Sequence, residues 1–144
     1  MSAGHLTLVR HAESTYNAAR RANGDPSVPV GLSPAGREQA RALARALAGV
    51  PFDLAVRTRF PRTAETLAIM LEGRSVPVDV YPELDDVDVG DFEGGPVDAY
   101  RAWRAHHGPS ESPPGGESPL AALARYVAGY ERLLASGTRC TLVV

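Results

Sequence analysis

Residues 6–17 read LTLVRHAESTYN, and this stretch decides how the rest of the chain is interpreted. Leu6 to Val9 is a run of apolar and β-branched residues, which is typical of a strand covered on both faces of a parallel sheet. Arg10 and His11 follow without a spacer. Charged groups at the end of a buried strand are costly unless something uses them. Either the pair marks the exit of the strand into solvent, or the strand presents a catalytic pair.

Beyond this stretch, strand-like and helix-like segments alternate. Ser33 with Pro34, and Ser118 with Pro119, are typical of helix starts. The expected strands cover 5–10, 52–58, 75–84 and 139–144, and the expected helices cover 34–49, 59–73, 97–106 and 118 onward. This alternation indicates an α/β fold, a three-layer sandwich with a largely parallel sheet, and prolines place the third strand toward an edge. The last helix carries apolar residues at helical spacing: Leu120, Leu123, Val127, Tyr130 and Leu134.

The composition is that of an ordinary soluble globular protein, with 44% apolar and 22% charged residues among 144, enough for one domain over 1–144. The net charge is −2 and the longest basic run is Arg20-Arg21, so neither nucleic acid nor a membrane surface is expected as partner. The one cysteine, Cys140, excludes an intrachain disulfide. No signal peptide opens the chain and no membrane-spanning run occurs in it, so a cytoplasmic location is expected.

Three separated segments each place polar groups just after an expected strand. Arg10 and His11 follow the first strand, and Arg62 lies in the first turn of the helix after the second. Two arginine side chains recognise a phosphoryl group well, and a neutral histidine is a competent nucleophile toward phosphorus. Taken singly, an arginine near a helix start is more often a surface charge, and a histidine after a strand is more often satisfied locally, so it is the joint pattern that indicates a phosphoryl site. The acidic residues after the third strand, Asp85, Asp86 and Asp88, fit an acid catalyst, a solvated turn or a hard-cation site.

These segments resemble a known family. The stretch LVRHAESTYN (8–17) is similar to the signature of the histidine phosphatase superfamily, the phosphoglycerate-mutase-like proteins. Further blocks resemble the family in the same order along the chain: GLSPAGREQARALA (31–44), RTRFPRTAETL (57–67), LDDVDVGDFEG (84–94) and GGESPLAALARYVAGYERLL (115–134). The resemblance therefore covers nearly the whole chain.

The resemblance implies a metal-independent phosphomonoester phosphatase. It makes His11 the nucleophile that becomes phosphohistidine, Arg10 and Arg62 the groups that bind the phosphoryl group, and Asp86 the proton donor, where most members carry glutamate. The implied substrate-binding residues are Arg10, Asn17, Arg21, Gly24 and Arg62. No cofactor is implied, and the implied partner is a phosphorylated small molecule whose leaving group is chosen by a variable cap over about 91–117.

Two features complicate this assignment. His106 and His107 suggest a metal site, but adjacent histidines without companions at ligand spacing make that interpretation weak. In the family, a late strand runs into Ser-His-Gly, whose histidine completes the catalytic pocket, whereas the printed sequence ends at Val144. We therefore expect a fold that is incomplete at the C-terminus. The alternatives are a degenerate module that binds phosphorylated ligands without turnover, and a phosphoglycerate mutase-type phosphotransferase.

Overall fold

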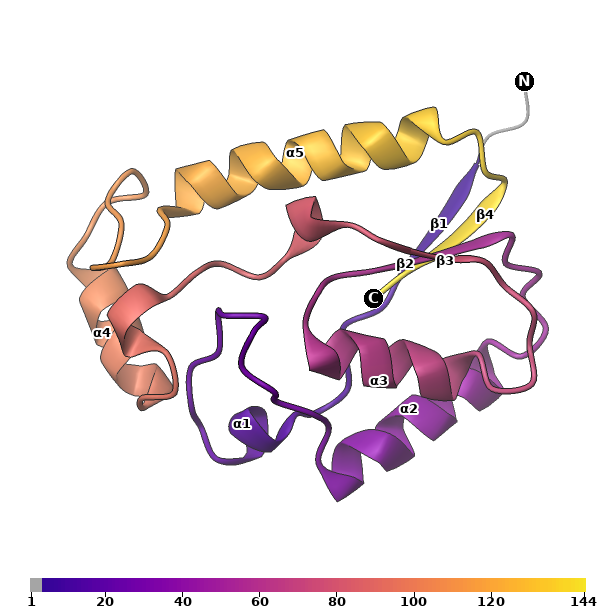
Figure 1. Cartoon of the computed structure of the whole chain (residues 1–144), viewed down its shortest axis with the longest axis horizontal. Helices are drawn as coiled ribbons and strands as arrows, with labels where there is room; N and C mark the ends of the chain where they lie inside the picture. Colours follow the sequence, from indigo (N-terminus) through magenta and orange to yellow (C-terminus); the bar gives the residue numbers. More distant parts are fainter. Residues whose placement is uncertain (1–3) are drawn as a thin grey trace.

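Four short strands form one parallel sheet in the computed structural model, which describes residues 4–144 (Figure 1). The strands are β1 (His5–Leu8), β2 (Leu54–Arg57), β3 (Val78–Val80) and β4 (Cys140–Val143), and their order in the sheet is β1-β4-β2-β3. Every neighbouring pair is parallel. The prediction of a parallel α/β sheet with the third strand at an edge is therefore confirmed.

Helices cover both faces of this sheet and give the predicted three layers. The helices are α1 (Thr15–Ala18), α2 (Pro34–Ala46), α3 (Pro61–Met70), α4 (Val97–Ala105) and α5 (Pro119–Ala135), with short 3-10 turns η1 (Pro82–Leu84) and η2 (Gly90–Phe92). In Figure 1, α2 and α3 lie on one side of the strands and α5 lies on the other. None of the helices within residues 4–144 combines the length and the apolar character needed to cross a membrane.

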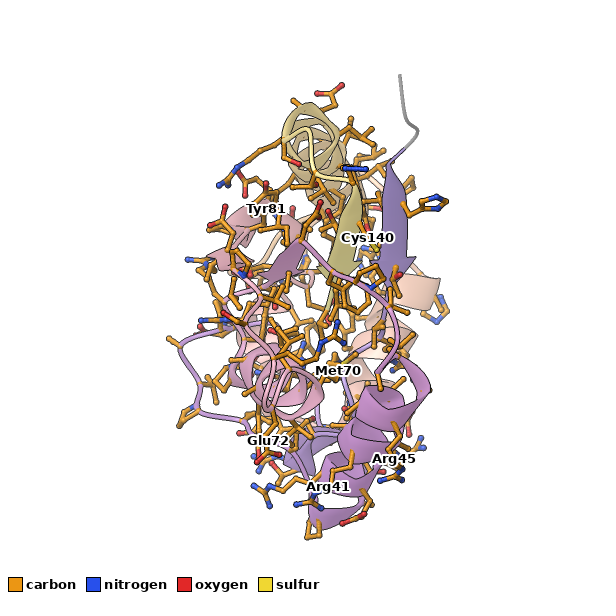
Figure 2. All side chains as sticks on the ribbon, turned by 90° about the vertical axis from the view of Figure 1, so that its right-hand side faces the viewer. Arg41, Arg45, Met70, Glu72, Tyr81 and Cys140 are labelled. Carbon is orange, nitrogen blue, oxygen red and sulfur yellow. The ribbon has the colours of Figure 1, made fainter. Side chains whose placement is uncertain are left out.

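An apolar cluster fills the space between the sheet and the helices on each of its faces. On the α2/α3 side, Ala55 and Leu142 of the sheet pack with Leu67 and Met70 of α3. Figure 2 shows Met70 inside the molecule, whereas Arg41 and Arg45 of α2 lie at its outer surface. On the α5 side, the cluster consists of Val56, Tyr81, Leu133 and Val143. Because side chains alternate between the faces of a strand, neighbouring residues of β2 and β4 serve opposite layers.

Local capping fixes where the helices begin. The hydroxyl groups of Ser33 and Ser118 accept hydrogen bonds from the backbone of Gly36 and Ala121, so both predicted starts are confirmed. The short helix α1, which the sequence did not predict, begins at a capping box in which Ser14 and Asn17 exchange hydrogen bonds. This box sets the path of the chain directly after His11.

One expectation about burial is wrong. Strand β1 is not covered on both faces: it lies at an edge of the sheet, with Leu6 and Leu8 exposed by 38% and 60%. The apolar series on α5 is likewise exposed at four positions, Leu120, Leu123, Val127 and Leu134. The helix instead buries Ala122, Gly129 and Leu133. Gly129 lies on the buried face, and a Cβ there would lie 2.8 Å from a methyl carbon of Leu84, so this position has no room for a side chain.

The segment over 91–117, the expected variable cap, contains α4 and the loop that follows it. The structure shows this loop tied to the chain after Asp86: the amide of Asp91 donates to the carbonyl of Pro114 at 2.9 Å, and the amide of Glu117 donates to Asp88 at 3.0 Å. Gly90, at φ +56°, allows the two segments to touch, because a Cβ there would lie 2.1 Å from the carbonyl oxygen of Pro114. This contact draws α4 toward the carboxyl ends of the strands.

Candidate active site

The predicted groups meet at one edge of the sheet. Arg10 and His11 follow β1, whose extension is held to β4 by a hydrogen bond of 2.8 Å from the amide of Val9 to the carbonyl of Val143. Arg62 stands in the first turn of α3, after β2, and Asp86 follows β3 and the turn η1. Because the carboxyl ends of parallel strands lie together, residues far apart in sequence converge here.

One guanidinium group contacts both candidate catalytic side chains. Arg62 donates from Nε to Nε2 of His11 at 3.1 Å and from Nη2 to Oδ2 of Asp86 at 3.1 Å. Its Nη1 donates to the amide oxygen of Asn23. The side chain is only 5% exposed, and its guanidinium stacks 4.1 Å from the centre of the Phe60 ring. Arg62 is therefore held rigidly at the base of the site.

The hydrogen bonds of His11 assign its tautomer. Nδ1 lies 2.7 Å from the carbonyl oxygen of Ala12 and donates to it, so Nε2, which accepts from Arg62, carries the lone pair. The amide of Ala12 donates to the buried hydroxyl of Thr66 on α3 at 3.1 Å, which fixes this turn. Burial lowers the pKa of His11, and the nearby charges of Arg62 and Arg10 lower it further. The geometry thus presents a neutral imidazole with its Nε2 lone pair toward the guanidinium.

The acidic residues after β3 differ in what they contact. Asp85 is buried and accepts from the backbone amide and the Nε of Arg59 at 2.8 and 2.6 Å. Asp88 caps its own turn by accepting from the amide of Gly90 at 2.9 Å. Asp86 alone of the three contacts Arg62, and its side chain is 57% exposed. The geometry brings Asp86, and neither of its acidic neighbours, beside His11.

A second arginine fixes the backbone on which Asp86 stands. Arg125 of α5 donates from Nη1 to the carbonyls of Glu83 and Asp85 at 2.9 and 2.7 Å, and from Nη2 to that of Asp86 at 3.4 Å. Glu117 pairs with Arg125 and also accepts from the amide of Asp88 at 3.2 Å. The sequence does not indicate this role for Arg125. The helical spacing of α5 showed only apolar positions, and no signal linked Arg125 to a segment 40 residues earlier.

A hollow opens above these groups. One part, of about 400 Å³, has His11 and Arg10 in its wall together with arginines from two other segments, Arg20, Arg21 and Arg101. An adjoining part of about 270 Å³ adds Arg62, Asp86 and Tyr100. Asn17 lines both parts. The predicted cap segment therefore contributes to the wall through Tyr100 and Arg101, whereas Trp103 stacks on His107 at 3.9 Å.

Gly24 has a different place from the one expected. It does not line the hollows that contain His11, and its backbone presses against the segment after Asp86. A Cβ at Gly24 would lie 2.3 Å from the carbonyl oxygen of Val87. Glu93 holds this turn, because its carboxylate accepts from the amide of Gly24 at 2.6 Å and from the side chain of Asn23 at 2.8 Å. Asn23 and Glu93 were not predicted, although they orient Arg62.

The remaining histidines lie elsewhere. Within residues 4–144, His11 is the one histidine that lines the hollows described above. His107 stacks on Trp103, and its Nδ1 lies 2.6 Å from the Trp103 carbonyl oxygen. Across the described part of the chain, no three His, Cys, Asp or Glu side chains are grouped so that they could hold a metal ion.

Comparisons with known proteins find relatives of this chain both in sequence and in structure. The adenosylcobalamin/α-ribazole phosphatase of Salmonella typhimurium is 38% identical over 88 residues, which is 61% of this chain and 43% of that protein. A phosphoglycerate mutase of Gloeobacter violaceus, named as 2,3-bisphosphoglycerate-dependent, is 32% identical over 125 residues, covering 78% of this chain and 55% of the relative. The crystal structure of the α-ribazole phosphatase from Shigella flexneri superimposes with a TM-score of 0.84 at 30% identity, over 96% of this chain and 72% of that one.

The matched stretch spans less than half the length of the curated α-ribazole phosphatases. The family itself is established by a match that runs through nearly every described residue. The family model described as histidine phosphatase superfamily (branch 1) aligns with residues 6–144, and the chain belongs to that superfamily.

Proposed function

We propose that the protein is a metal-independent phosphomonoester phosphatase that acts through a phosphohistidine on His11. The observation that carries this proposal is the pair of contacts made by Arg62, which join Nε2 of His11 to the carboxylate of Asp86. A nucleophile, a phosphoryl-binding cation and a proton donor within one hydrogen-bond chain are what phosphoryl transfer requires. The α-ribazole phosphatases among the relatives support hydrolysis as the reaction type.

In the first step, the lone pair on Nε2 of His11 attacks phosphorus, and the bond between phosphorus and the leaving oxygen breaks. Asp86, in its protonated form, gives its proton to that oxygen, so the leaving group departs as an alcohol rather than an alkoxide. Arg10 and Arg62 offset the charge on the phosphoryl oxygens. The hydrogen bond from Nδ1 to the carbonyl of Ala12 stabilises the imidazolium that forms on phosphorylation.

In the second step, water attacks the phosphohistidine. The nitrogen–phosphorus bond breaks, its electron pair returns to Nε2, and the Asp86 carboxylate accepts the proton that water loses. Neutral His11 and inorganic phosphate result. Because these proton transfers use side chains of the chain itself, the proposed cycle needs no metal ion or cofactor.

Asn17 and Arg21 line the same hollow, and we include them as substrate-binding residues. The side-chain oxygen of Asn17 accepts from both the amide and the hydroxyl of Ser14. Arg21 lies 4.6 Å from the centre of the Tyr16 ring and donates to the carbonyl of Gly94 at 2.5 Å. Gly24 has an indirect part in the proposal, through the segment that carries Asp86.

A second candidate is a module that binds phosphorylated ligands without turning them over. One observation favours it: within residues 4–144, His11 stands in the hollow without a second histidine. A phosphotransferase of the phosphoglycerate mutase type is the third alternative, supported by the mutases among the relatives.

The test is hydrolysis of 4-nitrophenyl phosphate at mildly acidic pH, combined with acid quenching to trap phosphohistidine. The proposal expects phosphate release and an acid-labile phosphoprotein, both absent from His11→Ala. Phosphate binding without either signal would favour the binding module. Transfer of the phosphoryl group to added phosphoglycerate in preference to water would favour the mutase.

A further inference from the structure

Three arginines line the hollow besides those that the proposed reaction steps use. Arg20 and Arg21 follow α1, and Arg101 lies on α4, about 80 residues later in sequence. All three line the same part of the hollow, of about 400 Å³, as His11. They therefore face whatever the substrate carries beyond its transferred phosphoryl group.

Backbone hydrogen bonds bring the segments of this cluster together. The amide of Val97 donates to the carbonyl of Arg20, and the amide of Ala22 donates to that of Gly95, both at 2.9 Å. These bonds join the segment after α1 to the start of α4. Arg20 adopts φ +53°, and no other non-glycine residue within 4–144 has a positive φ. This left-handed conformation closes the C-terminus of α1, where the amide of Arg20 donates to the carbonyl of Asn17 at 3.0 Å and the amide of Arg21 donates to that of Tyr16 at 2.8 Å.

The cluster holds more positively charged than negatively charged side chains. Asp98 accepts two hydrogen bonds from Nη2 of Arg20, at 2.8 and 3.0 Å, and its Oδ1 lies 3.5 Å from Nη1 of Arg101. Arg21 contacts a carbonyl oxygen and the Tyr16 ring, and the hydrogen bonds of the described chain give it no carboxylate partner. Glu13, also in the wall, accepts a hydrogen bond from the hydroxyl of Ser33. Three guanidinium groups therefore face two carboxylates, one of which is turned to Ser33.

We propose that this cluster is a second anion-binding subsite, which selects substrates whose leaving group carries a carboxylate or a second phosphate. The inference rests on the proposed function, because it takes the end of the hollow at His11 as the phosphoryl site. Arg101 and Arg20 bind the distal anion through charge-assisted hydrogen bonds, at the expense of their shared contact with Asp98. The alternative is that Arg20, Arg101 and Asp98 form a surface ion-pair network with no ligand.

The experiment measures binding by titration calorimetry with three phosphonates, which cannot be hydrolysed. Phenylphosphonate offers one anion, 4-phosphonobenzoate adds a carboxylate, and 1,4-phenylenediphosphonate adds a second phosphonate. The full chain is expected to bind at least one doubly anionic probe roughly tenfold more tightly than phenylphosphonate. Which of the two shows the larger gain identifies the distal group.

Arg101→Gln and Arg20→Asn test the residues, asparagine being chosen because it tolerates a positive φ. Each is expected to abolish most of the preference while leaving the affinity for phenylphosphonate within about twofold. Arg45→Gln is the matched control: it removes the same charge from the outer surface of α2 (Figure 2) and is expected to keep the preference.

Equal affinities for the three probes in the unaltered chain, or a preference that survives Arg101→Gln, would overturn the subsite. Failure to bind any of the probes would overturn it as well. A preference without His11-dependent hydrolysis would leave the subsite intact and contradict the phosphatase proposal alone.

Discussion

Arg62 lies 3.1 Å from Asp86, measured from Nη2 to Oδ2, and the same guanidinium group lies 3.1 Å from His11 through Nε. The nucleophile and the proton donor are therefore both positioned by one rigid, buried guanidinium group. A bound phosphoryl group would enter between these contacts and exchange them for its own oxygens. The consequences can be tested residue by residue.

Arg62→Lys keeps the positive charge but removes the planar guanidinium group that contacts three side chains. We expect phosphate affinity to fall roughly 10- to 100-fold, because hydrogen bonds between charged groups are lost and an ammonium group cannot replace them. Phosphate titration by calorimetry measures the loss. Arg57→Lys, on β2, is the comparison, since its Nη1 donates only to the adjacent carbonyl of Thr58. Equal losses in both variants would contradict a specific role for Arg62.

Asp86→Asn and Asp85→Asn should fail in different ways. Asp86→Asn removes the proposed donor, so turnover of alkyl phosphates should fall about 100-fold or more while phosphate still binds. Asp85→Asn weakens the buried contacts with Arg59, so we expect a loss of about 1–3 kcal/mol in the free energy of unfolding and a smaller change in turnover. Rates with alkyl and nitrophenyl phosphates, together with urea melts, separate the two effects. An equal kinetic loss from Asp85→Asn would refute the assignment.

His11 should make stability depend on pH in a definite direction. Because the pKa of His11 is lowered in the folded protein, the unfolded chain binds more protons once the pH falls below the ordinary value of 6.5. The contribution of His11 to stability is thus complete above pH 6.5 and is lost as the pH falls toward its folded pKa. We expect His11→Gln to show a smaller drop in melting temperature on acidification than the unaltered chain. His106→Gln, at an exposed position, should behave like the unaltered chain.

Gly24→Ala tests the contact between the turn after α1 and the segment that carries Asp86. A Cβ would lie 2.3 Å from the carbonyl oxygen of Val87 and 2.6 Å from the amide nitrogen of Val89, so the backbone must move. We expect a loss of about 1–3 kcal/mol in stability and reduced turnover. Gly49→Ala meets no atom within 4 Å and should be close to neutral. Thermal melts and steady-state rates check both, and an unchanged Gly24→Ala would show that the two segments move independently.

Arg125→Gln should displace the backbone on which Asp86 stands without touching any atom of the substrate. We expect turnover of alkyl phosphates to fall roughly 10- to 100-fold, and that of nitrophenyl phosphate to fall less, because a good leaving group needs little protonation. Arg132→Gln, also on α5, removes the same charge from exposed contacts with Asp79 and Glu83 and serves as the control. A uniform loss across both substrates would indicate a structural role only.

The sequence predicted the parts of the site that depend on strand ends. Arg10 and His11 follow β1 directly, and the topology of a parallel sheet brings Arg62 and Asp86 to the same edge, as expected. Asn23 and Arg125 could not be predicted, because their contacts depend on how loops pack across 39 and 40 residues of sequence. Loop packing leaves no periodic signal in the chain.

Burial was the least predictable property. The apolar run of β1 fits a covered strand and an edge strand equally well, since the pattern records which side chains are apolar and not what lies against them. The same holds for α5, where small residues, Ala122 and Gly129, form the buried face and larger apolar residues lie outside. Close approach of a helix to the chain around Leu84 selects small side chains there, which hydropathy alone does not register.

The strand order also determines when the strands can pair during synthesis of the chain. Strand β4, residues 140–143, lies between β1 and β2, so β1 pairs only with a segment made about 135 residues later. During synthesis, strand β1, which precedes His11, stays unpaired until the chain has been made as far as Val143. Local helices and the β2–β3 pair can form earlier, but β1 can join the sheet only after β4 has been made, so folding on the ribosome cannot fix the position of the nucleophile before then.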